Sequence, residues 1–252
     1  MRAVFLGYDT DILDALRESC EVVGVYVAAT RWRGLRDWPL SHHGVRVRLR
    51  EFLNAHPTRL RRWHRRLMRY HITDHARARG LALLPAPSVN DERFRRTLSE
   101  LRPDIGVVAN FGEILKQPLL NIPRHGFINF HPSLLPQYRG PTPLPHMLLR
   151  GESRGGVTWH RVSAAIDGGD ILAQESFDIS PHDIVGDLNR RVARVAAGML
   201  PALMQAIERG TCRAVPQDER RASYYPKLSP EQKQQLKALE AERRVLQART
   251  PN

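Results

Sequence analysis

The stretch GFINFHPSLLPQYRGPTPL, residues 126–144, puts two polar side chains at the end of an apolar run and follows them with a proline-rich loop. The run at 127–130 is typical of a buried strand, in which side chains alternate between the two faces of a sheet. Asn129 and His131 therefore point to the same side. A strand that enters a core has no packing need for either group. Their pairing favours chemistry at the carboxyl end of this strand.

Further strands and helices are expected on both sides of this stretch. Apolar runs at 3–6, 22–29 and 105–110 predict buried strands, and helical patterns separate them at 10–16 and 90–101. Two more strands are expected at 156–162 and 170–179, before a helix at 184–207 that Gly210 ends. Continuous apolar strands separated by helices are typical of a parallel sheet covered on both faces. The predicted class is α/β, a doubly wound, mostly parallel, Rossmann-like sheet with a basic helical insert and a C-terminal helical tail.

The chain divides by composition into a main domain and a tail. Its 252 residues suffice for one or two domains, and we expect a main domain at 1–210 and a C-terminal extension at 211–252. The extension reads as a loop and then a charged helix at 230–249, whose thin apolar stripe consists of Leu236, Leu239 and Leu246. Such a helix is not stable alone, so it docks, pairs with a second subunit or frays. A homodimer through the extension is one of these expectations.

Composition excludes several classes of protein. The hydrophobic share of 42% and the charged share of 26% are ordinary for a globular chain. No apolar run reaches the about 20 residues of a membrane span, and the N-terminal run turns polar at Asp9, too early for a signal peptide. The expected location is therefore the cytoplasm, with no membrane partner. Cys20 and Cys212 lack the spacing of metal ligands and are expected to be free thiols.

The formal charge of +13 is concentrated in one segment. Residues 31–80, the predicted insert, hold 14 arginines against three acidic residues. This excess favours an anionic partner, either nucleic acid or a phosphorylated substrate, although a solvated arginine face would give the same pattern. Leu60, Trp63 and Leu67 form one stripe of a docked amphipathic helix. Irregularly spaced histidines in the insert do not indicate a metal site; they are His56, His64, His71 and His75.

The polar pair on the strand lacks an acidic partner in its own stretch. An Asn amide can hold a carbonyl oxygen, and a His can take or give a proton near neutral pH. Asp167 is the best candidate acid, because the glycines of AAIDGGDIL let backbone and substrate approach closely. A solvent-exposed loop acid and a His at a capped strand end would look the same, so the residues alone leave this open.

Two motifs together carry a resemblance to a known family. NFHPSLLPQYRGPTPL, followed downstream by GVTWHRVSAAIDGGDILAQ, resembles the folate-dependent formyltransferases, whose motif runs Asn-x-His-Pro/Gly-Ser-Leu-Leu-Pro-x-Tyr/Trp-Arg-Gly before a Gly-Val-Thr strand and an Asp-x-Gly loop. The spacing of 36 residues from His131 to Asp167 also fits. The resemblance implies transfer of a formyl group from 10-formyltetrahydrofolate to an amine, without a metal. It implies that Asn129, His131 and Asp167 are catalytic.

The resemblance also implies binding residues. Those assigned to the folate are Phe111, Gly112, Ile114, Leu115, Ser133, Leu135 and Asp167. Those assigned to the acceptor are Tyr138, Arg139 and Asp170. Plain core packing is the alternative interpretation for Phe111, Ile114 and Leu115, and a turn role is the alternative for Asp170.

The acceptor is the least determined part of this prediction. A nucleotide-linked aminosugar is our first expectation, since guanidinium groups bind a diphosphate bidentately. A small amine or hydroxylamine from a natural-product or siderophore pathway is an alternative. So is methionyl-tRNA, because PQDERRASYYPKLS resembles the linker that follows the catalytic domain in tRNA-type enzymes.

Other classes remain as competing hypotheses. One is an inactive, basic nucleic-acid-binding protein on the same scaffold, and another is a formyltetrahydrofolate hydrolase. A nicotinamide dehydrogenase fits poorly, because GYDTDI lacks the glycine fingerprint that binds pyrophosphate. The expected partner is an anionic small molecule, with nucleic acid second.

Overall fold

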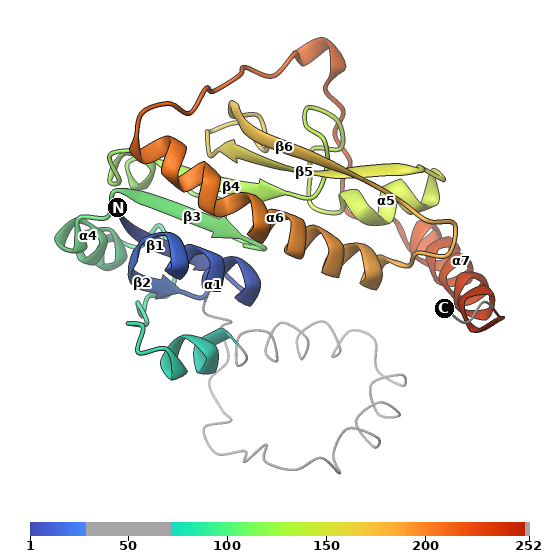
Figure 1. Cartoon of the computed structure of the whole chain (residues 1–252), viewed down its shortest axis with the longest axis horizontal. Coiled ribbons are helices and arrows are strands. Elements are labelled where there is room, and N and C mark those ends of the chain that lie inside the picture. The colour runs from blue at the N-terminus through green and yellow to red at the C-terminus, as the bar shows by residue number, and fades with distance from the viewer. Residues whose placement is uncertain (29–71, 250–252) are drawn as a thin grey trace.

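The computed structural model describes residues 1–28 and 72–249, and its centre is a single sheet (Figure 1). The strands lie in the order β2-β1-β3-β4-β5-β6. Their bounds are β1 (Arg2–Gly7), β2 (Glu21–Tyr26), β3 (Ile105–Ala109), β4 (Phe127–His131), β5 (Arg154–Arg161) and β6 (Ile171–Asp178). Neighbours from β2 to β4 are parallel, whereas β5 runs antiparallel to both β4 and β6. The predicted mostly parallel α/β sheet is confirmed.

Two strands differ from their predicted bounds by more than one residue, for reasons of pairing. The second strand was expected to continue to residue 29, but β2 ends at Tyr26, which pairs with Leu6 near the end of β1. The fifth strand was expected to begin at residue 156, but Arg154 already pairs with Asp178 of β6. In both cases the neighbouring strand sets the length.

Helices cover the two faces of the sheet. On one face, α1 (Thr10–Ser19) packs against α6 (Val185–Glu208), and Trp159 of β5 anchors α6 by donating from Nε1 to the carbonyl of Ala196 at 3.1 Å. On the other face, α4 (Glu92–Leu101) buries Phe94 and Leu98. Each fully buried side chain of this kind stabilises the fold by about 1.5–3 kcal/mol.

The ends of these helices follow the expected sequence signals. Asp9 caps α1 by accepting from the backbone N–H of Ile12 at 3.1 Å, and Asp91 caps α4. Gly210 follows the end of α6 with φ +67, a backbone conformation that favours glycine. Two short 3-10 helices, η1 (Leu119–Asn121) and η2 (Glu219–Arg221), complete the connections.

One helix was not predicted from the sequence and begins at the end of the predicted proline-rich loop. Helix α5 (Pro143–Leu149) follows the proline-rich stretch, with Pro143 at its first position. Proline is tolerated in the first turn of a helix, because the N–H that it lacks has no partner there. The helix then buries Leu144, Met147 and Leu148 against the core.

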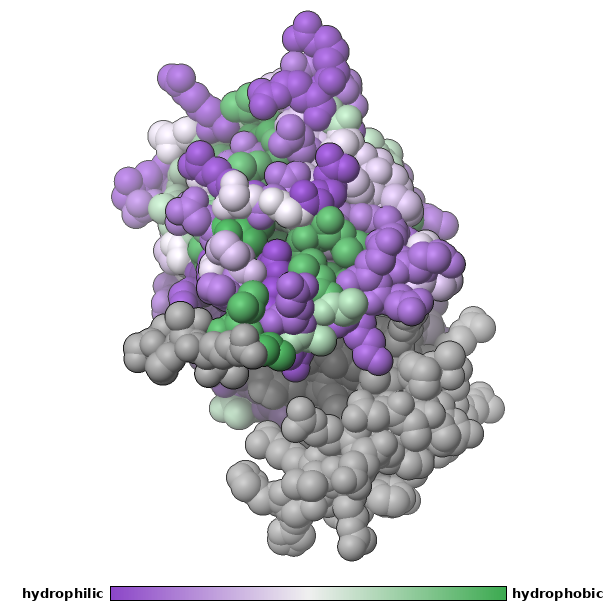
Figure 2. Space-filling model, turned by 90° about the vertical axis from the view of Figure 1, so that its right-hand side faces the viewer, coloured by the Kyte–Doolittle hydropathy of each residue, from purple (hydrophilic) through white to green (hydrophobic). Residues whose placement is uncertain are grey.

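The C-terminal extension is attached to the main domain. Helix α7 (Pro230–Arg249) packs Leu236 and Leu239 against the core, and Arg243 donates to the carbonyl of Asp183 at 2.6 Å. Of the three expected outcomes for this helix, the structure shows docking. Figure 2, which views the end of the molecule where α5 and α7 lie, shows a largely hydrophilic surface with smaller hydrophobic areas between.

Most of the predicted insert, including the stripe of Leu60, Trp63 and Leu67, lies outside the described residues. Its end forms a helix at 72–78, where His75 and Arg79 contact the carboxylate of Asp14 at 3.0 and 2.6 Å. Cys20 and Cys212 are free, as expected. Within residues 1–28 and 72–249, no cluster of His, Cys, Asp or Glu could hold a metal ion, and no helix is long and apolar enough to cross a membrane.

Candidate active site

Strand β4 carries the first two candidate groups at its carboxyl end. Phe127, Asn129 and His131 lie on the sheet face opposite Ile128 and Phe130, and the apolar cluster on their face includes Phe127 but neither polar group. The strand pattern therefore presents Asn129 and His131 just beyond the core. This is the arrangement that the sequence predicted.

His131 is held in one tautomer. Its ring Nε2 lies 2.7 Å from the backbone carbonyl of Tyr138, and the ring is almost fully buried. Because a carbonyl oxygen can only accept, Nε2 must carry the proton and donate it. In the neutral ring, Nδ1 then keeps its lone pair. This atom lies 3.6 Å from Oδ1 of Asp167.

Asp167 reaches this place from the turn between β5 and β6. Its backbone is left-handed, with φ +51. The N–H of Gly140 donates to its Oδ2 at 2.9 Å, so the loop after β4 orients the carboxylate. A Cβ on the nearby Gly169 would lie 1.9 Å from the carbonyl oxygen of Arg161, and only glycine allows this close approach.

The extension also fixes the turn that carries Asp167. The side-chain amide of Gln217 donates to the carbonyls of Asp167 and Gly169 at 2.8 and 2.7 Å. Its oxygen accepts from Arg139 at 2.8 Å, and Arg139 also pairs with Glu219. Gln217 was not predicted from the sequence, because nothing local marks a contact 50 residues distant.

A second histidine, His160, belongs to the same cluster and was not predicted as a site residue. It lies on β5 directly opposite Asn129 in the antiparallel register. Its Nδ1 donates to the carbonyl of Arg161 at 2.9 Å, so its Nε2 is free to accept from the amide of Asn129 at 3.1 Å. His160 thereby sets which way the Asn129 amide points.

The signal for His160 was present in the sequence. Thr158 and His160 stand two residues apart in an apolar run, as Asn129 and His131 do. The structure pairs Asn129 with His160 and His131 with Thr158, so two polar pairs face one another across adjacent strands. Thr158 also binds the loop after β4, donating to the carbonyl of Ser133 at 2.6 Å.

Burial keeps both rings neutral. It lowers the pKa of His131 below the usual histidine range, against the opposing effect of the Asp167 carboxylate. It lowers the pKa of His160 to about 4, with a further contribution from the neighbouring His131. At neutral pH, Nδ1 of His131 is therefore an unprotonated base beside a carboxylate.

The loop after β4 uses several predicted binding residues for its own structure. Ser133 is fully buried and donates to the carbonyl of Gln137 at 2.7 Å, and Leu135 is buried as well. Tyr138 stacks on Tyr225 of the extension, with ring centroids 4.6 Å apart. The folate and acceptor contacts assigned to these residues and to Arg139 stay predictions.

The segment after β3 divides between core and surface. Leu115 is buried, and Phe111 packs edge-on against Tyr26, with ring centroids 5.9 Å apart. Ile114 is 64% exposed, and a Cβ on Gly112 would meet open space. In this segment Ile114 and Gly112 have the exposure that ligand contact needs.

The turn that carries Asp167 also contains Asp170. The backbone carbonyl of Asp170 accepts from the N–H of Arg161 at 2.9 Å. This contact belongs to the turn, and the acceptor role of the side chain stays a prediction.

Comparison with known proteins identifies the family. A family model described as Formyl transferase matches residues 11–204, which contain Asn129, His131 and Asp167. The chain belongs to the formyl transferase family. A methionyl-tRNA formyltransferase of Chloroflexus aggregans is 39% identical over 235 residues, which span 92% of this chain and 67% of that protein. Other methionyl-tRNA formyltransferases, such as that of Roseiflexus castenholzii at 41% identity, match over about half of their own length.

Solved formyl transferases share the fold. WlaRD, a sugar 3N-formyl transferase solved with dTDP and 5-N-formyl-THF, superposes with a TM-score of 0.62 at 18% identity, covering 90% of this chain and 70% of that one. Glycinamide ribonucleotide transformylase 1 of Symbiobacterium toebii gives a TM-score of 0.60 at 22% identity, covering 86% and 94%. At these identities the likeness concerns the formyl transferase fold alone.

Proposed function

We propose that this formyl transferase moves a formyl group from 10-formyltetrahydrofolate to the amine of an aminoacyl-tRNA, methionyl-tRNA being the expected acceptor. The observation that carries the proposal is the unprotonated Nδ1 of His131, 3.6 Å from Asp167 and on the same strand face as Asn129. A general base, a carboxylate and an amide donor in one place are the groups that acyl transfer to an amine requires.

Each group has a defined task in this reaction. When the amine attacks the formyl carbon, a C–N bond forms and the carbonyl oxygen becomes negative. One N–H of Asn129 is bound to His160, and its second N–H can stabilise that oxygen. A well-placed donor of this kind contributes about 3–4 kcal/mol to the transition state.

His131 and Asp167 act on the proton that the attacking amine must lose. The attached amine becomes an ammonium, whose proton passes to Nδ1 of His131, and the Asp167 carboxylate stabilises the resulting imidazolium. Return of a proton to the folate nitrogen as the C–N bond to the folate breaks yields tetrahydrofolate and the formylated amine. Nε2 of His131 stays bound to the carbonyl of Tyr138 throughout, so the ring does not need to turn.

The relatives change our choice of acceptor. The first expectation was a nucleotide-linked aminosugar, and the sugar transferase WlaRD is similar in fold at 18% identity. The relatives with 34–41% identity are methionyl-tRNA formyltransferases, and this much closer likeness favours the tRNA acceptor. The arginine-rich segment suits phosphates of either acceptor. The aminosugar stays a prediction, to be tested beside the tRNA.

The deciding experiment is a panel of acceptors. The purified protein is incubated with 10-formyltetrahydrofolate and, separately, methionyl-tRNA, a dTDP-linked aminosugar and hydroxyornithine, and release of tetrahydrofolate is followed. We expect turnover with methionyl-tRNA, and none with the His131→Ala variant as a control for uncatalysed transfer. Turnover with the aminosugar alone would restore our first expectation. The proposal would be wrong if no acceptor gave turnover and calorimetry detected no folate binding.

A further inference from the structure

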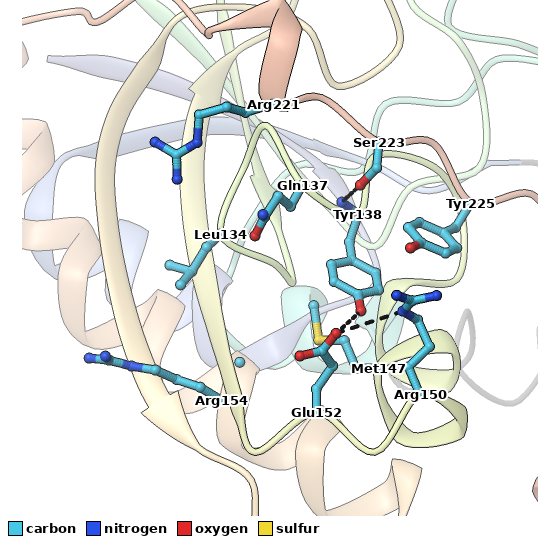
Figure 3. A pocket seen from close by; sticks show the side chains of 11 residues that line it. Leu134, Gln137, Tyr138, Met147, Arg150, Glu152, Arg154, Arg221, Ser223 and Tyr225 are labelled. Atoms are coloured by element: carbon cyan, nitrogen blue, oxygen red, sulfur yellow. Dashed lines mark hydrogen bonds and ion pairs between the residues drawn. The ribbon is translucent and has the colours of Figure 1, made fainter.

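A recess lies beside the β4–α5 loop (Figure 3). It has a volume of about 270 Å³. The loop, the end of α5, the start of β5 and the C-terminal extension all contribute to its wall. None of Asn129, His131 and Asp167 lines it, although Tyr138, a predicted acceptor contact, does.

Three arginines from three separate segments line this recess: Arg150 after α5, Arg154 at the start of β5 and Arg221 in η2. All three are exposed. The guanidinium of Arg221 makes no hydrogen bond or salt bridge with any described residue, and Arg154 makes a single bond, to Ser176 Oγ at 2.7 Å. Most donors of these two side chains are therefore available to a ligand.

One carboxylate, that of Glu152, lines the recess, and among the three arginines it contacts Arg150. Glu152 accepts a short hydrogen bond from the hydroxyl of Tyr138 and lies 3.7 Å from Nε of Arg150. Burial, with this hydrogen bond, raises the pKa of the Tyr138 phenol. The carboxylate is thus engaged on the Arg150 side, and among the described residues that line the recess no carboxylate contacts Arg154 or Arg221.

Neutral donors complete the wall. The Gln137 side chain is exposed at the recess. The Ser223 hydroxyl oxygen accepts from the backbone N–H of Tyr138 at 3.0 Å, so its proton remains free to donate. Guanidinium forks bind phosphate and carboxylate oxygens bidentately, and a phosphate has enough oxygens to accept from both guanidinium groups and from the neutral donors together. We propose that this recess binds a phosphate-bearing ligand.

Such a ligand would sit against the residue that holds the catalytic histidine. Tyr138 contributes its ring to the recess, while its backbone carbonyl accepts from Nε2 of His131 at 2.7 Å. The phosphate would come from a free nucleotide or from the backbone of a nucleic acid. The proposal does not depend on which amine is formylated.

The test compares ligand binding to two matched variants by calorimetry. In the first, Arg154→Gln is combined with Arg221→Gln. The control is Arg220→Gln, because Arg220 neighbours Arg221 but is 90% exposed, pairs with Asp218 and does not line the recess. The probes are pyrophosphate, a nucleoside diphosphate and a short single-stranded RNA.

We expect at least one probe to bind the wild type and the control variant with equal affinity. The same probe should bind the double variant at least tenfold more weakly. Loss of pyrophosphate and nucleotide binding would identify a free nucleotide as the ligand, and loss of RNA binding alone would identify a backbone phosphate. If no probe binds the wild type, or if every probe that binds does so equally in the double variant, the recess is not a phosphate site. Circular dichroism spectra of all three proteins exclude misfolding as the cause of a difference.

Discussion

The candidate active site has two halves that are built differently. Asn129, His131 and His160 lie on paired strands, so the sheet register fixes their relative positions. Asp167 lies in a turn with a left-handed backbone, and contacts from Gly140 and from Gln217 of the extension hold it. The proposed base and oxyanion donor, His131 and Asn129, thus depend on secondary structure, whereas Asp167 depends on a segment far along the chain.

This difference has a physical consequence. Strand positions are fixed by many backbone hydrogen bonds, so the loss of one side-chain contact changes the orientation of a side chain and leaves the backbone in place. The turn is held by fewer contacts, and Gly140 and Gln217 share them, so the loss of one contact leaves the other. Variants in the two halves should therefore lose activity in different ways, and the following predictions are ordered by the size of the expected effect.

Removing a reacting group should have the largest effect. We expect His131→Ala, Asn129→Ala and Asp167→Ala each to lower kcat by at least about 100-fold, while folate binding survives, because these groups act on charge that develops near the transition state. Steady-state kinetics and calorimetry measure the two quantities. A His131→Ala variant with more than about a tenth of wild-type activity would assign proton transfer to another group.

The strand half can be tested without removing a reacting group. His160→Leu deletes the acceptor that orients the Asn129 amide, and we expect kcat to fall about tenfold with KM unchanged. His160→Gln, which keeps an acceptor, should restore part of the rate. Equal kcat values for the two variants would show that His160 only fills space.

The turn that carries Asp167 can be tested by removing its hydrogen bonds from the C-terminal extension. Gln217→Ala removes both hydrogen bonds to the turn that carries Asp167, and we expect kcat to fall only about fivefold, because the N–H of Gly140 still holds the carboxylate. Gln234→Ala on α7 is the control, because Gln234 is exposed and distant in sequence from the turn. A Gln217→Ala variant with wild-type kinetics would mean that Gly140 alone positions the acid.

The last prediction concerns stability against acid, not activity. The pKa of His160 is lowered from 6.5 to about 4 in the folded state, so between these values the unfolded chain binds the extra proton. Stability should therefore fall as pH falls from 6.5 to about 4, with a share from His160 on the order of 1 kcal/mol per pH unit. Urea unfolding of wild type and His160→Gln measures this. If the free energy of unfolding changed with pH equally in the two proteins, His160 would not be buried in its neutral form.

The same two halves explain what the sequence could predict. Period-two patterns placed Asn129 and His131 on one side of a strand, and the fold follows from alternating strands and helices. The pairing of Asn129 with His160 depends on the register of an antiparallel neighbour, which no local pattern fixes. The bond from Gln217 to the Asp167 turn is a contact between distant segments, and neither segment carries a local signal for it.

The hydrogen bond from Gln217 to Asp167 also sets an order of events during synthesis. The turn leaves the ribosome 50 residues before the amide that holds it. A chain that has emerged only as far as α6 has all its strands and the three reacting side chains, but the acid is not yet held from the extension. Folding of the candidate active site is therefore completed from the C-terminal side, and nascent chains should reach full activity only after residue 217 has emerged.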